Sequence, residues 1–162
     1  MKPIPRKYLG SVVLGLTDAI VELTGTLAGL SFALQNTQII ALAGLITGIS
    51  AALSMASSEF LSKRAEKDRA PITAALYTGL TYILTVTILL IPFFIATTWQ
   101  AALAGTLILA AIVILIFSYV TAHEEHRPFR RNFGEMIVVS FTVAAISFGI
   151  GLFLRNLLEI NV

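Results

Sequence analysis

The chain has 162 residues, of which 57% are hydrophobic and 12% are charged, and its formal net charge at pH 7 is +2. A soluble domain carries about 25% charged residues, so this composition excludes a soluble enzyme and predicts an all-α membrane protein. The absence of cysteine excludes disulfides, thiolate zinc sites and iron–sulfur clusters.

Five apolar stretches, each long enough to cross a bilayer as a helix, follow one another along the chain. The first comes directly after Lys2, Arg6 and Lys7, as in a signal peptide. It contains two carboxylates, however, and no convincing cleavage site follows it, so we interpret it as a retained helix. No soluble domain is left over, which makes residues 1–162 a single transmembrane domain. The expected helices cover about 8–34, 39–63, 72–97, 101–121 and 134–157.

Two prolines and one tryptophan mark the ends of these helices. Pro71 is well placed to open the third helix, because a proline in the first turn loses no helical hydrogen bond. Pro92 predicts a kink near the far end of the same helix. Trp99, in the turn that follows, suits the interface between hydrocarbon and water.

The basic residues indicate the orientation. Ten of the eleven lysines and arginines lie in the N-terminal segment, in the loop at 63–69 or in the loop at 123–131. Positive residues accumulate on the cytoplasmic side, so we expect a cytoplasmic N-terminus and, after five spans, an external C-terminus. We therefore interpret these residues as topology signals and expect no nucleic-acid partner. An odd number of spans leaves no obvious inverted repeat, so a two-fold pathway requires a homodimer.

The first helix carries two carboxylates, Asp18 and Glu22, within its apolar stretch. Each costs about 2.5–3.5 kcal/mol at the centre of a membrane helix when it is ionised. No lysine or arginine lies at a similar depth to pair with them, which favours a bound cation or protonation over a salt bridge. A polar contact between helices, without a role in transport, is the alternative.

Along the second helix, small and polar residues recur every three or four positions and therefore share one helical face. They are Gly44, Gly48, Ala52, Met55, Glu59, Ser62 and Glu66. A similar stripe on the first helix consists of Asp18, Glu22, Gly25 and Gly29. We expect the two stripes to meet and to form a metal-ion pathway through the membrane. The structural role of the glycines is to let helices approach closely.

Four candidate ligands lie at different depths. At 1.5 Å per residue, Glu59 lies about 6 Å from the cytoplasmic end, Met55 about 12 Å, Asp18 about 15 Å and Glu22 about 21 Å. They form a ladder of carboxylates with one thioether. Such a set suits a divalent ion of intermediate softness, Fe²⁺ or Mn²⁺, without choosing between the two. The alternative for Met55 is packing, since methionine often fills gaps between helices.

Further acidic residues near the cytoplasmic side could collect cations at the entrance of the pathway. They are Glu66, Asp68, Glu124, Glu125 and Glu135. His123 and His126 lie beside them, but HEEH is not the HExxH pattern of zinc enzymes. The alternative for all of them is solvated charge beside the membrane.

The second helix also carries a family resemblance. SMASSEFLS, which runs from Ser54 to Ser62 and is followed by Glu66 and Asp68, resembles the second-helix signature of the vacuolar iron transporter family, roughly SMxxGEYxSxxSxxD. Asp18, followed eleven residues later by Gly29, is similar to the first-helix pattern of that family. The chain departs from the signature at two positions, where serine replaces glycine and phenylalanine replaces tyrosine. Its 2–3 loop also lacks the long metal-binding insertion of some relatives.

The resemblance implies a homodimeric Fe²⁺/Mn²⁺ transporter in the cell membrane that moves metal out of the cytosol by proton exchange. It implies Asp18 and Met55 as pore ligands and Glu59 near the cytoplasmic entrance. The metal is the transported ion, and no resident cofactor is expected. Some relatives have an acidic residue eight positions before the methionine, where this chain has Thr47, so we expect Glu22 to replace it.

One chain supplies few ligands, so a dimer with the first helix at the two-fold interface could complete the shell. Gly25 and Gly29 would permit that approach, and cysteines at Thr26 or Ala28 would cross-link the protomers. Two other functions compete. A small proton-coupled exporter of organic cations would need an aromatic cage beside Asp18, where the neighbours are small and aliphatic. A non-transporting membrane scaffold would not need the intramembrane carboxylates.

Overall fold

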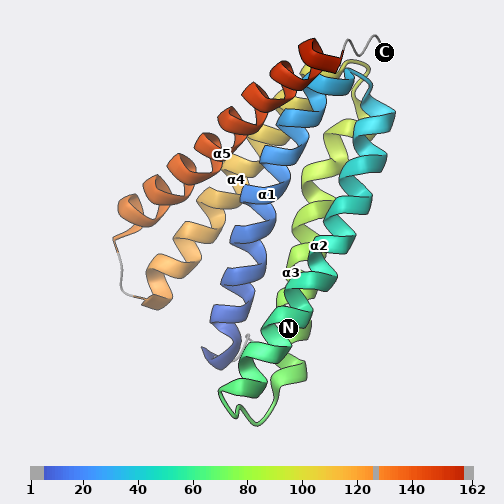
Figure 1. Ribbon diagram of the computed structural model, residues 1–162. Coiled ribbons are helices and arrows are strands. Elements are labelled where there is room, and N and C mark those ends of the chain that lie inside the picture. Colours follow the sequence, from blue (N-terminus) through green and yellow to red (C-terminus); the bar gives the residue numbers. More distant parts are fainter. Residues whose placement is uncertain (1–5, 126–127, 159–162) are drawn as a thin grey trace.

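The chain forms a bundle of five long helices (Figure 1). The computed structural model describes residues 6–125 and 128–158, and a short 3₁₀ turn, η1 (Arg6–Tyr8), precedes the first helix. The helices are α1 (Leu9–Leu34), α2 (Thr37–Ala65), α3 (Pro71–Ile95), α4 (Trp99–Glu125) and α5 (Phe129–Leu158). All five are long and apolar enough to cross a membrane, which confirms the predicted fold class.

The ends of the helices differ from prediction mainly at the basic end of the bundle, the end that carries the α2–α3 and α4–α5 connections. α4 continues to Glu125 and α5 already begins at Phe129, so most of the charged loop predicted at 123–131 is helical. Hydropathy marks where the hydrocarbon ends, whereas a helix ends at a cap or a proline. Pro128, directly before α5, is such a signal.

At the opposite end, the two connections are short turns of uncharged residues. Gln35, with φ of 51°, ends α1 in the left-handed region. The Asn36 side chain then caps α2, because its Oδ1 accepts hydrogen bonds from the backbone N–H groups of Gln38 and Ile39 at 3.0 and 3.1 Å. α3 begins at Pro71, as predicted. We refer to this end, with residues 35–38 and 97–100, as the polar-turn end.

α1 is the central helix and contacts each of the other four. Its most extensive contact is with α5, and the other large contact in the bundle joins α2 to α3. Figure 1 shows α4 and α5 spreading away from the other helices toward their connecting loop. Pro92 lies inside α3, and beside it the Thr106 hydroxyl of α4 donates to the Leu89 carbonyl at 2.8 Å. This bond ties the outer part of α3 to α4.

Glycines allow α1 to lie against its neighbours with almost no side chain between them. A Cβ at Gly15 would collide with the carbonyl oxygen of Thr78 on α3, and a Cβ at Gly151 on α5 would collide with the carbonyl oxygen of Gly29. A Cβ at Gly25 would lie 2.9 Å from Val143, also on α5. Gly25 and Gly29 therefore pack on α5 of the same chain, and the prediction that they form the two-fold contact is wrong.

The α1–α5 contact should tolerate no added methyl group at Gly151. We expect Gly151→Ala to lower the free energy of unfolding by about 1–3 kcal/mol, because backbone must move to admit the methyl group. Gly149→Ala is the matched control: it lies two residues away on α5, and nothing lies within 4 Å of its Cβ. That change should be neutral or stabilise by up to about 1 kcal/mol through helix propensity. Thermal unfolding in detergent measures both, and equal shifts would contradict the close contact.

Candidate functional site

The two carboxylates of α1 are one helical turn apart but lie in different surroundings. The Glu22 Oε2 accepts a hydrogen bond of 2.6 Å from the Tyr82 hydroxyl of α3. The Asp18 side chain is half-buried. Within the residues that the structure describes, no hydrogen bond or ion pair reaches its carboxylate. Of the two α1 carboxylates, Asp18 is therefore the one without a bonded partner among the described residues.

Tyr82 is a site residue that the sequence prediction missed. It is 1% exposed and lies in the middle of α3. A buried tyrosine normally places its hydroxyl on a polar partner, so a tyrosine in mid-span was the available signal. Its partner could not be chosen from the sequence, because that choice depends on how α1 and α3 face each other.

Glu59 is buried and held at the basic end of the bundle. Only 7% exposed, it accepts a hydrogen bond of 2.6 Å from the Ser11 hydroxyl of α1. The Ser11 carbonyl in turn accepts from the Thr78 hydroxyl of α3 at 3.1 Å. The Glu59 side chain therefore belongs to a polar contact that joins three helices. The sequence prediction named Glu59 but not Ser11.

The contacts between α1 and α2 give the relative depth of the predicted ligands. Ser11 lies beside Glu59, and Leu27 lies against Gly44, so the two helices are antiparallel in one register. Counting seven residues along each helix from the Ser11–Glu59 bond places Asp18 level with Ala52. Met55 is then about 4.5 Å nearer the basic end, within one turn of Asp18. This agrees with the depth estimated from the sequence.

The two stripes do not meet along their length. Gly48 of α2 lies against Val86, and a Cβ at Gly79 of α3 would lie 3.6 Å from the Ala52 carbonyl oxygen. Gly44 contacts Leu90 of α3 as well as Leu27 of α1, so the α2 stripe packs mainly on α3. The α1 glycines lie against α5 instead. Met55 is half-buried and packs against the apolar core. Small residues in a sequence predict that another helix can approach closely, but they do not indicate which helix it is.

The described part of one chain holds no cluster of three carboxylate or imidazole side chains that could bind a metal ion. The ladder predicted from the sequence would not form such a cluster either, since its carboxylates lie at different depths. An ion that passes Asp18 must complete its coordination with water, with Met55 or with groups from a second chain.

Comparison with protein families identifies the family to which these helices belong. The model of the VIT family matches residues 9–70 and 66–152, from the start of α1 far into α5. The chain belongs to the VIT family. No curated protein matches it. Membership confirms the family resemblance of the α2 signature and indicates a membrane transporter of metal ions, not an enzyme.

In this VIT protein, three of the acidic residues predicted to collect cations, Glu66, Asp68 and Glu135, are paired with basic ones. Asp68 forms an ion pair with Lys7 at 2.7 Å. Two further ion pairs each join residues three or four positions apart in the sequence. Those pairs are Lys63–Glu66 at 2.9 Å and Arg131–Glu135 at 2.8 Å. The side chains of His123, Glu124, Glu125 and His126 lie outside the described residues. A cation-collecting rim therefore stays a prediction.

Asp68 links the segment before α1 to the loop before α3. Besides Lys7, its Oδ1 accepts from the Ala70 backbone N–H at 2.7 Å. The hydrogen bond from Lys7 is the main cause that holds the pKa of the Asp68 carboxyl below its usual 3.8, and the Ala70 bond adds to it. A carboxyl with a lowered pKa stabilises the fold above its unfolded pKa, and this contribution is lost as the pH falls through its folded pKa.

We expect Lys7→Met to raise the pKa of Asp68 toward its usual value, since the largest cause of the shift is removed. Arg64→Met is the control, because it removes a nearby exposed charge that makes no bond to Asp68. NMR titration of the labelled aspartate carboxyl in micelles measures the two variants beside the wild type. An unchanged Asp68 pKa in Lys7→Met would contradict the ion pair.

Proposed function

We propose that this VIT-family protein carries Fe²⁺ or Mn²⁺ out of the cytosol in exchange for protons, as a homodimer in the cell membrane. The observation that carries the proposal is Asp18, a half-buried carboxylate inside a membrane helix without a protein partner among the described residues. An ionisable group at such a place is functional by default, because it is costly to keep. Met55 lies within one turn of its depth and adds a softer ligand.

The competing functions fit the contacts less well. A non-transporting scaffold would account for Glu22, because its hydrogen bond to Tyr82 is a polar contact between helices. It would not account for Asp18, which has no such contact among the described residues. An exporter of organic cations needs aromatic faces around its carboxylate. Tyr82, the nearby aromatic residue, is 1% exposed and directs its hydroxyl to Glu22. A small inorganic cation is therefore the better substrate.

A dimer would bring two copies of each ligand to one axis. α5 covers Gly25 and Gly29, but α4 and α5 spread away from α1 toward the basic end (Figure 1). We therefore place the two-fold contact on the part of the same α1 face nearer the basic end, at Leu14 and Asp18. These two residues are four apart and share one helical face, and Leu14 is 39% exposed in the single chain. Ala28 is only 3% exposed, so a cysteine there is a poor choice for cross-linking.

Asp18→Asn should abolish most metal transport and leave the fold intact. The amide keeps the shape of the side chain but loses the charge that attracts the cation, and it costs less to bury. We expect Fe²⁺ or Mn²⁺ flux into dye-loaded liposomes to fall at least about tenfold. Loss of a residue that only supports a metal ligand already lowers metal affinity or activity by about tenfold or more, and Asp18 is proposed as a ligand itself. Arg155→Gln is the control, because it removes a charge in the last turn of α5, outside the proposed pathway, and should transport normally. Normal flux in Asp18→Asn would exclude the pathway.

Glu22 should be interchangeable with an acidic residue at position 47. From the Leu27–Gly44 and Ser11–Glu59 contacts, Thr47 lies within about 3 Å of the depth of Glu22. We expect Glu22→Ala to lose most flux and Thr47→Glu to restore part of it, with a large coupling in the double-mutant cycle. Tyr82→Phe removes the hydrogen bond to Glu22 but keeps the Glu22 carboxylate, so it separates the effect of this bond from the effect of the charge. Independent effects of the two changes would leave Glu22 with no more than a structural or vestibule role.

Cross-linking tests the proposed two-fold contact, and the chain has no native cysteine to interfere. Leu14→Cys should form a disulfide or a short bismaleimide link between protomers in membranes. Phe153→Cys is the control: it is 64% exposed on α5 and should not link if α1 forms the axis. A monomer that transports metal in detergent-free vesicles would refute the dimer.

A further inference from the structure

Two cavities of opposite character meet at the polar-turn end of the bundle. The first, of about 530 Å³, is apolar and lies between α1, α4 and α5. The second, of about 330 Å³, is polar and lies between the turns at 35–38 and 97–100. Trp99 and Gln100 line both, so the two cavities are contiguous. Together they have an apolar body and a polar end.

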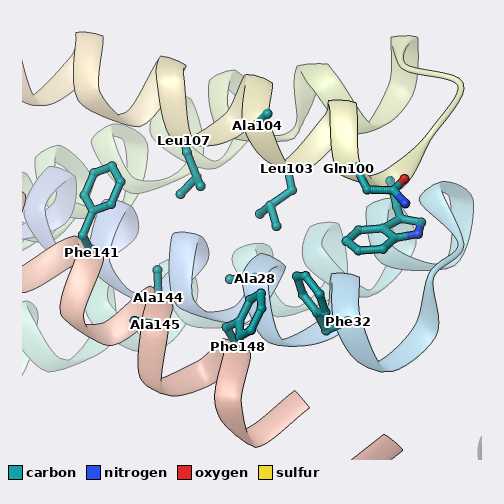
Figure 2. A pocket seen from close by; sticks show the side chains of 11 residues that line it. Ala28, Phe32, Gln100, Leu103, Ala104, Leu107, Phe141, Ala144, Ala145 and Phe148 are labelled. Atoms are coloured by element: carbon teal, nitrogen blue, oxygen red, sulfur yellow. The ribbon is translucent and has the colours of Figure 1, made fainter. Parts of the chain in front are cut away.

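The apolar cavity is built from aromatic and small side chains. In Figure 2, Leu103 and Leu107 of α4 face Phe141 and Phe148 of α5. Phe32 of α1 closes the end toward the turns, with ring centroids 3.8 Å from Phe148 and 4.7 Å from Trp99. Small residues, Ala28 and Ala144, both nearly fully buried, leave the space open.

The apolar cavity continues along α5 toward the middle of the membrane. A neighbouring groove of about 600 Å³ on α5 shares Phe141 and Ala145 with it. From Ile137 to Phe148, the combined groove extends for about 16 Å at 1.5 Å per residue. Figure 1 shows α4 and α5 spreading away from the other helices toward their connecting loop. The groove is open to the surroundings, since Val138 and Ile146, which line it, are 64% and 59% exposed. Its shape is long and narrow, as an extended hydrocarbon chain requires.

The polar cavity offers hydrogen bonds but no charge. All of the residues that line it are uncharged, in the turns 35–38 and 97–100. Asn36 is already occupied as the cap of α2. The side chains of Gln35, Gln38 and Gln100 make no hydrogen bond to any other described residue and are open to a ligand. None of the lining side chains would balance a charge, so the lining favours a polar group without net charge.

We propose that this composite cavity binds one membrane lipid with a hydrogen-bonding headgroup of no net charge, drawn from the leaflet opposite the basic loops. An acyl chain fills the groove between α4 and α5, and the headgroup lies on the two polar turns. A transmembrane helix of a second copy matches the apolar part alone and leaves the polar cavity unused. A metal ion finds no charged ligand in either part. Only an amphiphile matches both.

Trp99 is the only tryptophan of the chain and lies where the two cavities meet, so it reports on the site directly. The experiment titrates delipidated, detergent-solubilised protein with phosphatidylethanolamine that carries bromine on its acyl chains, which quenches a nearby tryptophan. We expect saturable quenching at one lipid per chain. A brominated hydrocarbon without a headgroup should bind at least about tenfold more weakly, a difference of 1.4 kcal/mol.

Three variants separate specific binding from general contact with lipid. Ala104→Phe fills the groove and should abolish the saturable phase, whereas Ala101→Phe, at an exposed alanine one turn away that does not line the cavity, should leave it unchanged. Gln100→Leu should reduce the advantage of the phospholipid over the hydrocarbon.

Linear quenching that is equal in all variants would overturn the proposal. So would protection of Trp99 from quenching by dimerisation, which would assign the groove to a second copy. Tighter binding of phosphatidylglycerol than of phosphatidylethanolamine would overturn the assignment of an uncharged headgroup.

Discussion

The bundle depends on one constraint: between the two faces of a membrane, each polar group must find its partner inside the protein. Threonines meet it locally, as when the Thr24 hydroxyl donates to the Ile20 carbonyl one turn earlier at 2.6 Å. Glu22 and Glu59 meet it across helices, through Tyr82 and Ser11. α1, the central helix, takes part in both of these pairs. Asp18, on the same helix, stands apart from this pattern, as do the Ser31 and Ser140 hydroxyls, which are buried without a hydrogen-bond partner among the described residues.

The glycines of α1 set the distances that make these pairs possible. At Gly15 the backbones of α1 and α3 touch, and Thr78 at that contact also donates to the Ser11 carbonyl. A side chain at position 15 would push α3 away and lengthen the reach of Tyr82 to Glu22. The polar contacts between α1 and α3 therefore depend on the close packing at Gly15. This explains how a serine and a tyrosine on different helices each come within 2.6 Å of a carboxylate on another.

Much of the fold could be predicted from the sequence, because each signal involved is local. Hydropathy gave the five spans, and Pro71 gave the start of α3. The partners of the site residues could not be predicted, because they depend on which faces of separate helices meet. The stripe with Gly25 and Gly29 shows the limit: it correctly indicated a close contact but was assigned to a second protomer instead of α5. Tyr82 was missed for the same reason.

The different states of Asp18 and Glu22 bear on how metal and protons could exchange. On the proposed route from the basic end, a cation would reach Asp18 before Glu22, which lies about 6 Å further along α1. An occupant of Glu22 must share or displace the hydrogen bond from Tyr82, whereas no hydrogen bond or ion pair from the described residues competes at Asp18. Two carboxylates one turn apart repel each other when both are ionised. A cation at Asp18 relieves that repulsion, and its departure restores it unless another positive charge arrives. A proton on either carboxylate would meet that need, and this is how the pair would serve the proposed exchange of metal for protons.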